Sequence, residues 1–60
     1  MKVYVQKSGA YVSFEKLTPR GMYLVKLYNA AGSLLDKVRC DDYRNARSYV
    51  KSFILIARNN

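Results

Sequence analysis

Residues 22–40 constrain the fold most, because they have the pattern of a β-hairpin. Two runs rich in strand-forming side chains flank the turn sequence NAAG at 29–32. A two-residue type I′ turn would force both alanines to positive φ, whereas a type I turn followed by a glycine in the left-handed region suits these residues. We therefore predict strands over about 22–29 and 33–40, joined by a type I turn with a G1 bulge at Gly32.

The turn also predicts how the two strands pair, because a slip of one residue moves every side chain to the other face of the sheet. It places Lys26 opposite Asp36, and a cross-strand ion pair of this kind belongs on the side that faces water. The residues then expected on the other face, in the core, are Tyr23, Val25, Leu27 and Leu35.

The water-facing side of the hairpin still carries apolar residues in this register. Tyr28 is expected opposite Leu34, and Leu24 opposite Val38. Exposed apolar patches on a small protein usually mark contact sites. We therefore predict a protein interface or homodimer contact at Leu24, Tyr28, Leu34 and Val38. The alternative is a register that differs by one residue, which would exchange the two faces.

Two more strands are expected before the hairpin. Residues 2–7 and 10–17 both alternate with a period of two and are rich in Val, Tyr and Phe. The segment TPRG at 18–21 has proline and glycine where a turn prefers them, so the chain reverses there.

A helix is expected at the C-terminal end, over about 42–58. Asp41 and Asp42 offer an N-cap, Arg58 suits the negative C-terminal end, and no proline or glycine interrupts the segment. Apolar residues follow a helical period at Tyr43, Ala46, Val50, Phe53, Ile54 and Ala57, with Tyr49 and Ile56 on one flank.

These patterns together predict one α+β domain over residues 1–60. Its sheet is a four-stranded antiparallel β-meander (about 2–7, 10–17, 22–29 and 33–40), and one C-terminal helix (about 42–58) packs on one face. A chain of 60 residues is marginally stable on its own. One cysteine and no histidine exclude an intrachain disulfide and argue against a zinc site, which leaves tight packing or oligomerisation.

Catalysis, a metal and a cofactor are not expected from this inventory of side chains. The acidic residues are few, and no histidine is present to serve as a base. Cys40 precedes a helix N-terminus, where a thiol pKa can fall, but a lone cysteine more often acts as a small hydrophobic residue. No apolar run is long enough to cross a bilayer and no signal-peptide pattern is present, so we expect a cytoplasmic protein.

The charge of the chain predicts an anionic partner. Eleven Lys and Arg against four Asp and Glu give a formal charge of +7, which suits nucleic acid or an acidic protein surface. On the helix, Arg44, Arg47, Lys51 and Arg58 share a face at spacings i, i+3, i+7 and i+14. The predicted binding residues are Arg44, Arg47, Lys51, Arg58, Lys16, Arg20, Lys26 and Tyr28, with Tyr4 and Tyr11 as further stacking rings near Lys2 and Lys7. The alternative is a solvated basic surface of the kind found on many small proteins.

The segment YLVKLYNAAGSLLDKVRCDDYRNARSYVKSF resembles the YegP-like strand-and-helix repeats and some compact phage-encoded inhibitors, including certain anti-CRISPR proteins. The likeness covers about 30 residues and is one of pattern. The YegP-like pattern has an Asn-Gly turn where this chain has Asn-Ala-Ala-Gly, and no functional residue is carried over from either group.

Three functions are therefore considered. The first is a non-enzymatic nucleic-acid-binding protein with weak sequence preference. The second is a phage- or virus-type inhibitor or adaptor that binds a host protein or nucleoprotein complex, which would place it in the host cytoplasm. The third is a structural subunit whose main contact is with a second copy of itself.

Overall fold

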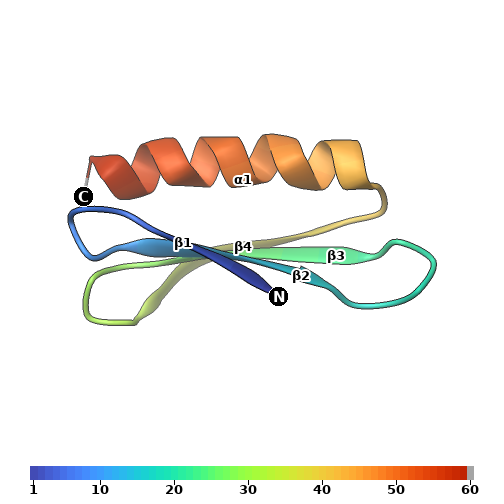
Figure 1. Cartoon of the computed structure of the whole chain (residues 1–60), viewed down its shortest axis with the longest axis horizontal. Helices are drawn as coiled ribbons and strands as arrows, with labels where there is room; N and C mark the ends of the chain where they lie inside the picture. Colours follow the sequence, from blue (N-terminus) through green and yellow to red (C-terminus); the bar gives the residue numbers. More distant parts are fainter. Residues whose placement is uncertain (60) are drawn as a thin grey trace.

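The computed structural model describes residues 1–59 and shows an antiparallel sheet covered on one face by a single helix (Figure 1). The sheet has the order β1-β2-β3-β4, so each strand lies beside the next one in the sequence. The predicted α+β fold, a four-stranded β-meander with a C-terminal helix, is confirmed. The elements are β1 (Lys2–Val5), β2 (Tyr11–Lys16), β3 (Tyr23–Tyr28), β4 (Leu34–Cys40) and α1 (Tyr43–Arg58).

The helix begins where the sequence predicted it. The Asp42 carboxylate accepts a hydrogen bond of 2.7 Å from the backbone N–H of Asn45, which is an N-cap interaction. At the other end, the Ser8 hydroxyl donates to the carbonyl oxygen of Ala57 over 3.0 Å and ties the β1–β2 turn to the helix. Among the described residues, no helix is long and apolar enough to span a membrane.

The core lies between the sheet and the helix. The apolar stripe of α1 packs on the side chains that β2 and β3 turn toward it, while Tyr49 and Ile56 lie at the rim of this stripe and stay exposed. Period-two alternation on the strands and helical spacing on α1 bring these residues together. The buried apolar residues are Ala10, Val12, Phe14, Val25, Leu27, Cys40, Ala46, Val50, Phe53 and Ala57.

The turn at the end of the hairpin has the predicted geometry. Gly32 has φ of +88°, and its N–H donates to the carbonyl oxygen of Asn29 over 2.9 Å. The N–H of Asn29 donates in turn to the carbonyl oxygen of Ser33 over 3.0 Å. This is a type I turn with the glycine in the left-handed region. Tyr28 therefore faces Leu34, as predicted.

The register changes one residue further into the hairpin, so the predicted pairing of β3 and β4 is wrong beyond Tyr28. Leu27 faces Asp36, which leaves Leu35 as an extra residue on β4. A β-bulge of this kind sets two residues of one strand against one of its neighbour and shifts all later pairs. Leu35, predicted to lie in the core, is 48% exposed.

The bulge exchanges the two faces of β4 from Asp36 onward and leaves those of β3 unchanged. Val38 faces Val25 and packs against the core under the helix, so its assignment to an outer interface is wrong. Lys26 faces Lys37 in place of the predicted Asp36. Leu24 was expected opposite Val38 and instead faces Arg39. The predicted core residues Tyr23, Val25 and Leu27 do lie on the helix side.

Candidate nucleic-acid interface

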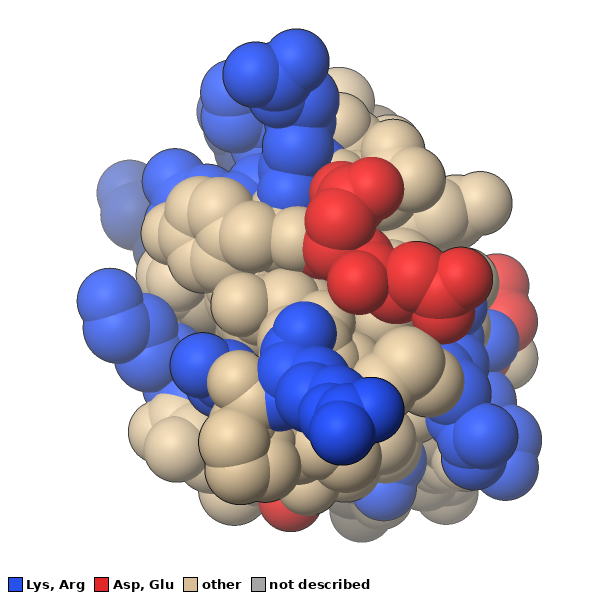
Figure 2. Space-filling view, turned by 90° about the vertical axis from the view of Figure 1, so that its right-hand side faces the viewer, with Lys and Arg blue, Asp and Glu red and all other residues tan. Residues whose placement is uncertain are grey.

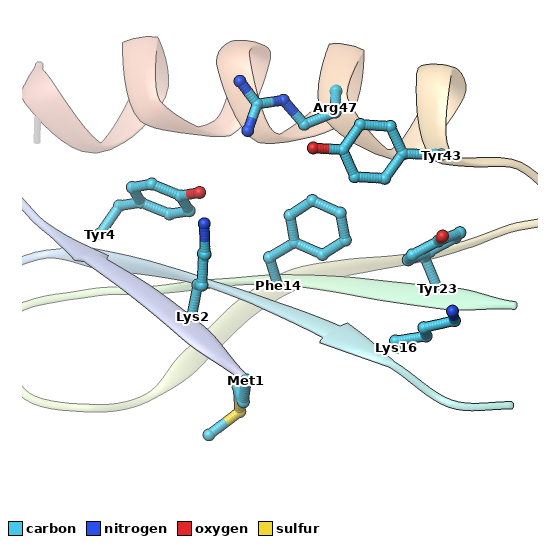
Figure 3. Close-up of a pocket in the computed structure, with 8 residues that line it drawn as sticks. All are labelled: Met1, Lys2, Tyr4, Phe14, Lys16, Tyr23, Tyr43 and Arg47. Carbon is cyan, nitrogen blue, oxygen red and sulfur yellow. The ribbon is translucent and has the colours of Figure 1, made fainter. Parts of the chain in front are cut away.

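A groove of about 350 Å³ opens between the first turns of α1 and the β1–β2 side of the sheet (Figure 3). In Figure 3 the side chains of Lys2 and Phe14 rise from β1 and β2 toward the helix, Arg47 extends over the groove from α1, and Met1 points away from the helix. We call it the helix–sheet groove. Its lining residues are Met1, Lys2, Tyr4, Phe14, Lys16, Tyr23, Tyr43 and Arg47.

The strand register explains why these residues meet. Lys2 pairs with Phe14 across β1 and β2, so both side chains lie on the side of the sheet that faces the helix. Lys16 follows Phe14 at the next position on that side, because side chains two apart on a strand share a face. On α1, Tyr43 and Arg47 are four residues apart, which places them one turn apart on the same face.

The floor of the helix–sheet groove is aromatic. The rings of Phe14, Tyr23 and Tyr43 lie within 5.5 to 5.9 Å of one another, two of the three pairs edge-to-face. Aromatic pairs favour such offset and edge-to-face arrangements. Phe14 is buried, whereas Tyr43 is 55% exposed and offers an accessible ring. The Arg47 guanidinium carbon lies 5.8 Å from the centroid of the Tyr43 ring, within cation–π range.

A second hollow of about 290 Å³ continues along the helix and shares Tyr43 and Arg47 with the first. We call the two together the basic groove. Among the residues that the structure describes, no Asp or Glu lines either part. Figure 2 looks at the end of the molecule where α1 begins, and most of the Asp and Glu side chains visible there gather on one side, with a further one at the lower edge. The cationic side chains of the basic groove are Lys2, Lys16, Arg44, Arg47 and Lys51.

The structure brings together four of the eight predicted binding residues, namely Lys16, Arg44, Arg47 and Lys51. Arg58 lies outside the basic groove, about 10 Å further along the helix axis from Lys51 at 1.5 Å per residue. Arg20 also lies outside it, in the turn between β2 and β3. The other two residues, Lys26 and Tyr28, lie on the opposite side of the sheet.

The side of the sheet that the helix leaves uncovered is called the open face here. Tyr11 and Tyr28 stack across β2 and β3, with ring centroids 4.6 Å apart and an angle of 17° between the planes. Tyr4 was predicted to join them, but it lies on the helix side and lines the groove. The outward side chains of the open face are Val3, Val5, Tyr11, Ser13, Glu15, Leu24, Lys26, Tyr28, Leu34, Lys37 and Arg39.

Sequence reasoning missed Lys37 and Arg39 on the open face. The run KVRC at 37–40 alternates charged and apolar residues, so it indicates by itself that Val38 and Cys40 point into the core. Leu34 and Leu35, two adjacent leucines, come before this run, and the alternation of inward and outward side chains is interrupted there. Phe14 and Tyr23 were missed as groove residues because an aromatic residue on a strand gives no sign of whether it packs in the core or lines a groove.

Cys40 is a free cysteine that is buried at the end of β4. Burial raises the pKa of its thiol, and the negative charges of Asp42 and Asp41 raise it further. The lowering of a thiol pKa that a helix N-terminus can cause is therefore outweighed at Cys40 by burial and by the two carboxylates that precede α1. No group of three or more His, Cys, Asp or Glu is placed to hold a metal in the part of the chain described, residues 1–59.

The fold and the grooves define a small α+β domain with a basic, aromatic-floored groove beside its helix. No protein-family model, no curated protein and no solved structure matches this chain. Function is therefore inferred from the side chains and their placement.

Proposed function

We propose that this protein is a non-enzymatic binding module that holds single-stranded nucleic acid in the basic groove, with weak sequence preference. The observation that carries the proposal is the combination of five cationic side chains with an exposed aromatic ring and no lining carboxylate among the described residues. Proteins that bind single strands combine a positive groove that follows the backbone with aromatic rings on which bases stack.

The charges of the basic groove support binding to phosphates. Arg44, Arg47 and Lys51 are exposed along about two turns of α1, and Lys2 and Lys16 stand on the opposite wall. Lysine and arginine that neutralise phosphates release condensed counterions, which drives binding at low salt. A row of this length can follow several phosphates of one strand.

The rings of the groove support stacking of a base. Tyr43 is exposed, and its contacts with Phe14 and Tyr23 hold it in place. A volume of about 350 Å³ lies at the small end of the range for ligand sites, which suits one or two nucleotides better than a duplex. Every base has a π-face, so stacking on Tyr43 with flexible cations around it gives little sequence preference.

Fluorescence anisotropy with a labelled oligothymidylate and a matched duplex tests the proposal. Four or five phosphate contacts predict a slope of log K against log salt of about −3 for a single strand. Arg47→Ala should weaken binding about tenfold and reduce the slope by about 0.7. Tyr43→Leu, which keeps an apolar side chain but removes the ring, should weaken binding by a similar factor without changing the slope.

Arg58→Ala is the matched control, because Arg58 is an exposed cation of the same helix that lies outside the basic groove. It should bind nearly as the unaltered protein does. Absence of binding to any oligonucleotide at low salt would refute the proposal. Equal losses in Arg47→Ala and Arg58→Ala would show that only net charge matters and that the groove is not a site.

The second candidate function is a phage- or virus-type inhibitor or adaptor that acts on a host protein. The exposed apolar side chains of the open face, such as Leu34 and Val5, favour it. A positive field would speed association with an acidic surface. Partners captured from lysate that survive nuclease treatment would favour this function, and partners lost with the nucleic acid would favour the first.

A further inference from the structure

Two lysines face each other on the open face of the sheet. Lys26 on β3 and Lys37 on β4 are direct cross-strand partners. Like charges in this arrangement destabilise a sheet, and opposite charges stabilise it. The nearest acid along β4, Asp36, is paired with Leu27 and so lies on the helix side, where its carboxylate accepts from the backbone N–H of Lys37 over 2.8 Å. The lysine pair therefore forms a site that an anion would stabilise.

The surroundings of the lysine pair add a third cation and an aromatic surface. Arg39 follows Lys37 on the same side of β4. Tyr28 follows Lys26 on β3 at about 6.8 Å, the rise of two residues, and stacks on Tyr11. A planar ring at this distance from a pair of cations matches a nucleotide, whose base can stack while its phosphate lies between the lysines.

We infer that the open face is a second contact site for single-stranded nucleic acid, with the phosphate held by Lys26, Lys37 and Arg39 and a base stacked on the Tyr11–Tyr28 pair. This inference rests on the proposed function and extends it. The basic groove lies on the helix side of the sheet and the open face on the other side, so one chain holds two strands, or two segments of one strand, at the same time.

A second copy of the chain fits the open face poorly. Three cations, Lys26, Lys37 and Arg39, stand there with Glu15 as the one acidic side chain among the described strands. Stacking two such faces would bring like charges together as the surfaces lose water, which costs several kcal/mol in an interface. An acidic peptide would satisfy the cations but would not use the rings of Tyr11 and Tyr28, which are half-buried and leave part of their surface accessible.

The experiment counts the short oligonucleotides bound per chain. An oligothymidylate of about three nucleotides is too short to pass round an edge of a domain that is 17 × 16 Å in cross-section and to occupy both sites, so each bound copy reports one site. Native mass spectrometry and isothermal titration at low salt should show two copies bound to the unaltered protein. Lys37→Glu should bind one copy, with the affinity of the remaining site within about twofold of the basic groove alone.

Two variants separate this site from its alternatives. Lys7→Glu makes the same charge change in the β1–β2 turn, outside both surfaces, and should still bind two copies. Arg47→Ala should weaken binding in the basic groove and leave binding on the open face unchanged. Lys37→Glu should abolish binding on the open face and leave binding in the basic groove unchanged. With two differently labelled oligonucleotides, energy transfer should appear with the unaltered protein and disappear with Lys37→Glu.

The outcomes distinguish the two proposals. One copy bound by the unaltered protein, with no change in Lys37→Glu, would overturn the second site and leave the basic groove intact. No copy bound would overturn the groove and the second site together. An open face that binds poly-glutamate in a Lys37-dependent way, but not the oligonucleotide, would assign that face to an acidic protein and overturn the inference.

Discussion

The Lys37→Glu variant should be more stable than the unaltered protein, although it loses a binding site. Lys26 and Lys37 are cross-strand partners, and the Cβ atoms of such partners lie about 4.5–5.5 Å apart, so we take about 6 Å for the separation of the two charged ends. At that distance two unit charges interact by about 0.7 kcal/mol in water, so reversing one sign gains at most about 1.4 kcal/mol. Salt screening and side-chain freedom reduce the expected gain to about 0.5–1 kcal/mol.

Urea denaturation followed by circular dichroism measures this gain. With a slope of about 1 kcal/mol per molar urea, the midpoint should rise by about 0.5–1 M. The difference should shrink in concentrated salt, where the Debye length falls to about 3 Å. Lys7→Glu relieves the overall positive charge equally, so its effect is subtracted as the control. A Lys37→Glu variant less stable than Lys7→Glu would refute the reasoning, because it would show that Lys37 does not face Lys26.

Three further predictions test the fold. Asp42→Ala removes the carboxylate that caps α1 and should lower the free energy of unfolding by about 1 kcal/mol, whereas Asp42→Asn should keep most of it, as thermal denaturation would show. Val25→Ala opens a cavity in the buried core and should lower the free energy of unfolding, measured by urea titration, by about 2 kcal/mol. Leu35→Asp, in the exposed bulge, should lower it by less than about 0.5 kcal/mol. Equal losses in the two variants would contradict the register. The raised pKa of the Cys40 thiol favours the neutral form in the folded state, so stability should decline as the pH rises above about 8.5, where the unfolded thiol ionises, and Cys40→Ala should remove this decline.

The elements of the fold could be predicted because each has a strong local signal. Alternation marks the strands, and the capping Asp42 with its apolar stripe marks the helix. The type I turn followed from the cost of positive φ for alanine, and the structure has it. The fold class depends only on these local patterns and on the order in which they occur, because short connections leave a meander as the simplest arrangement.

The candidate site could be predicted only in part, because it depends on which elements lie side by side. Arg44, Arg47 and Lys51 share a helix face, and helical geometry alone predicts this. That Lys2 and Lys16 face them across an aromatic floor depends on how the helix lies over β1 and β2, which no local pattern encodes. The charge of the chain predicts an anionic partner but not the side of the sheet on which it binds.

The bulge on β4 makes two pairing requirements compatible, one from the turn and one from the core, whose registers differ by one residue. The turn requires Tyr28 to face Leu34, and the core requires Val38 to face Val25, since both valines pack under the helix. No regular ladder meets both, so the strand accommodates one extra residue, Leu35. A prediction that derives every residue pair of the hairpin from the turn is therefore wrong from the first pair whose position is determined by packing in the core.

The same bulge determines the chemistry of the open face. Without it, Lys26 would face Asp36 and the surface would be locally neutral and apolar, which suits a protein contact. With it, Lys37 and Arg39 turn outward beside the stacked Tyr11–Tyr28 pair, and the carboxylate of Asp36 lies on the other side. A single inserted residue thus replaces an ion pair by three cations, and a neutral face becomes one suited to an anionic ligand with planar rings.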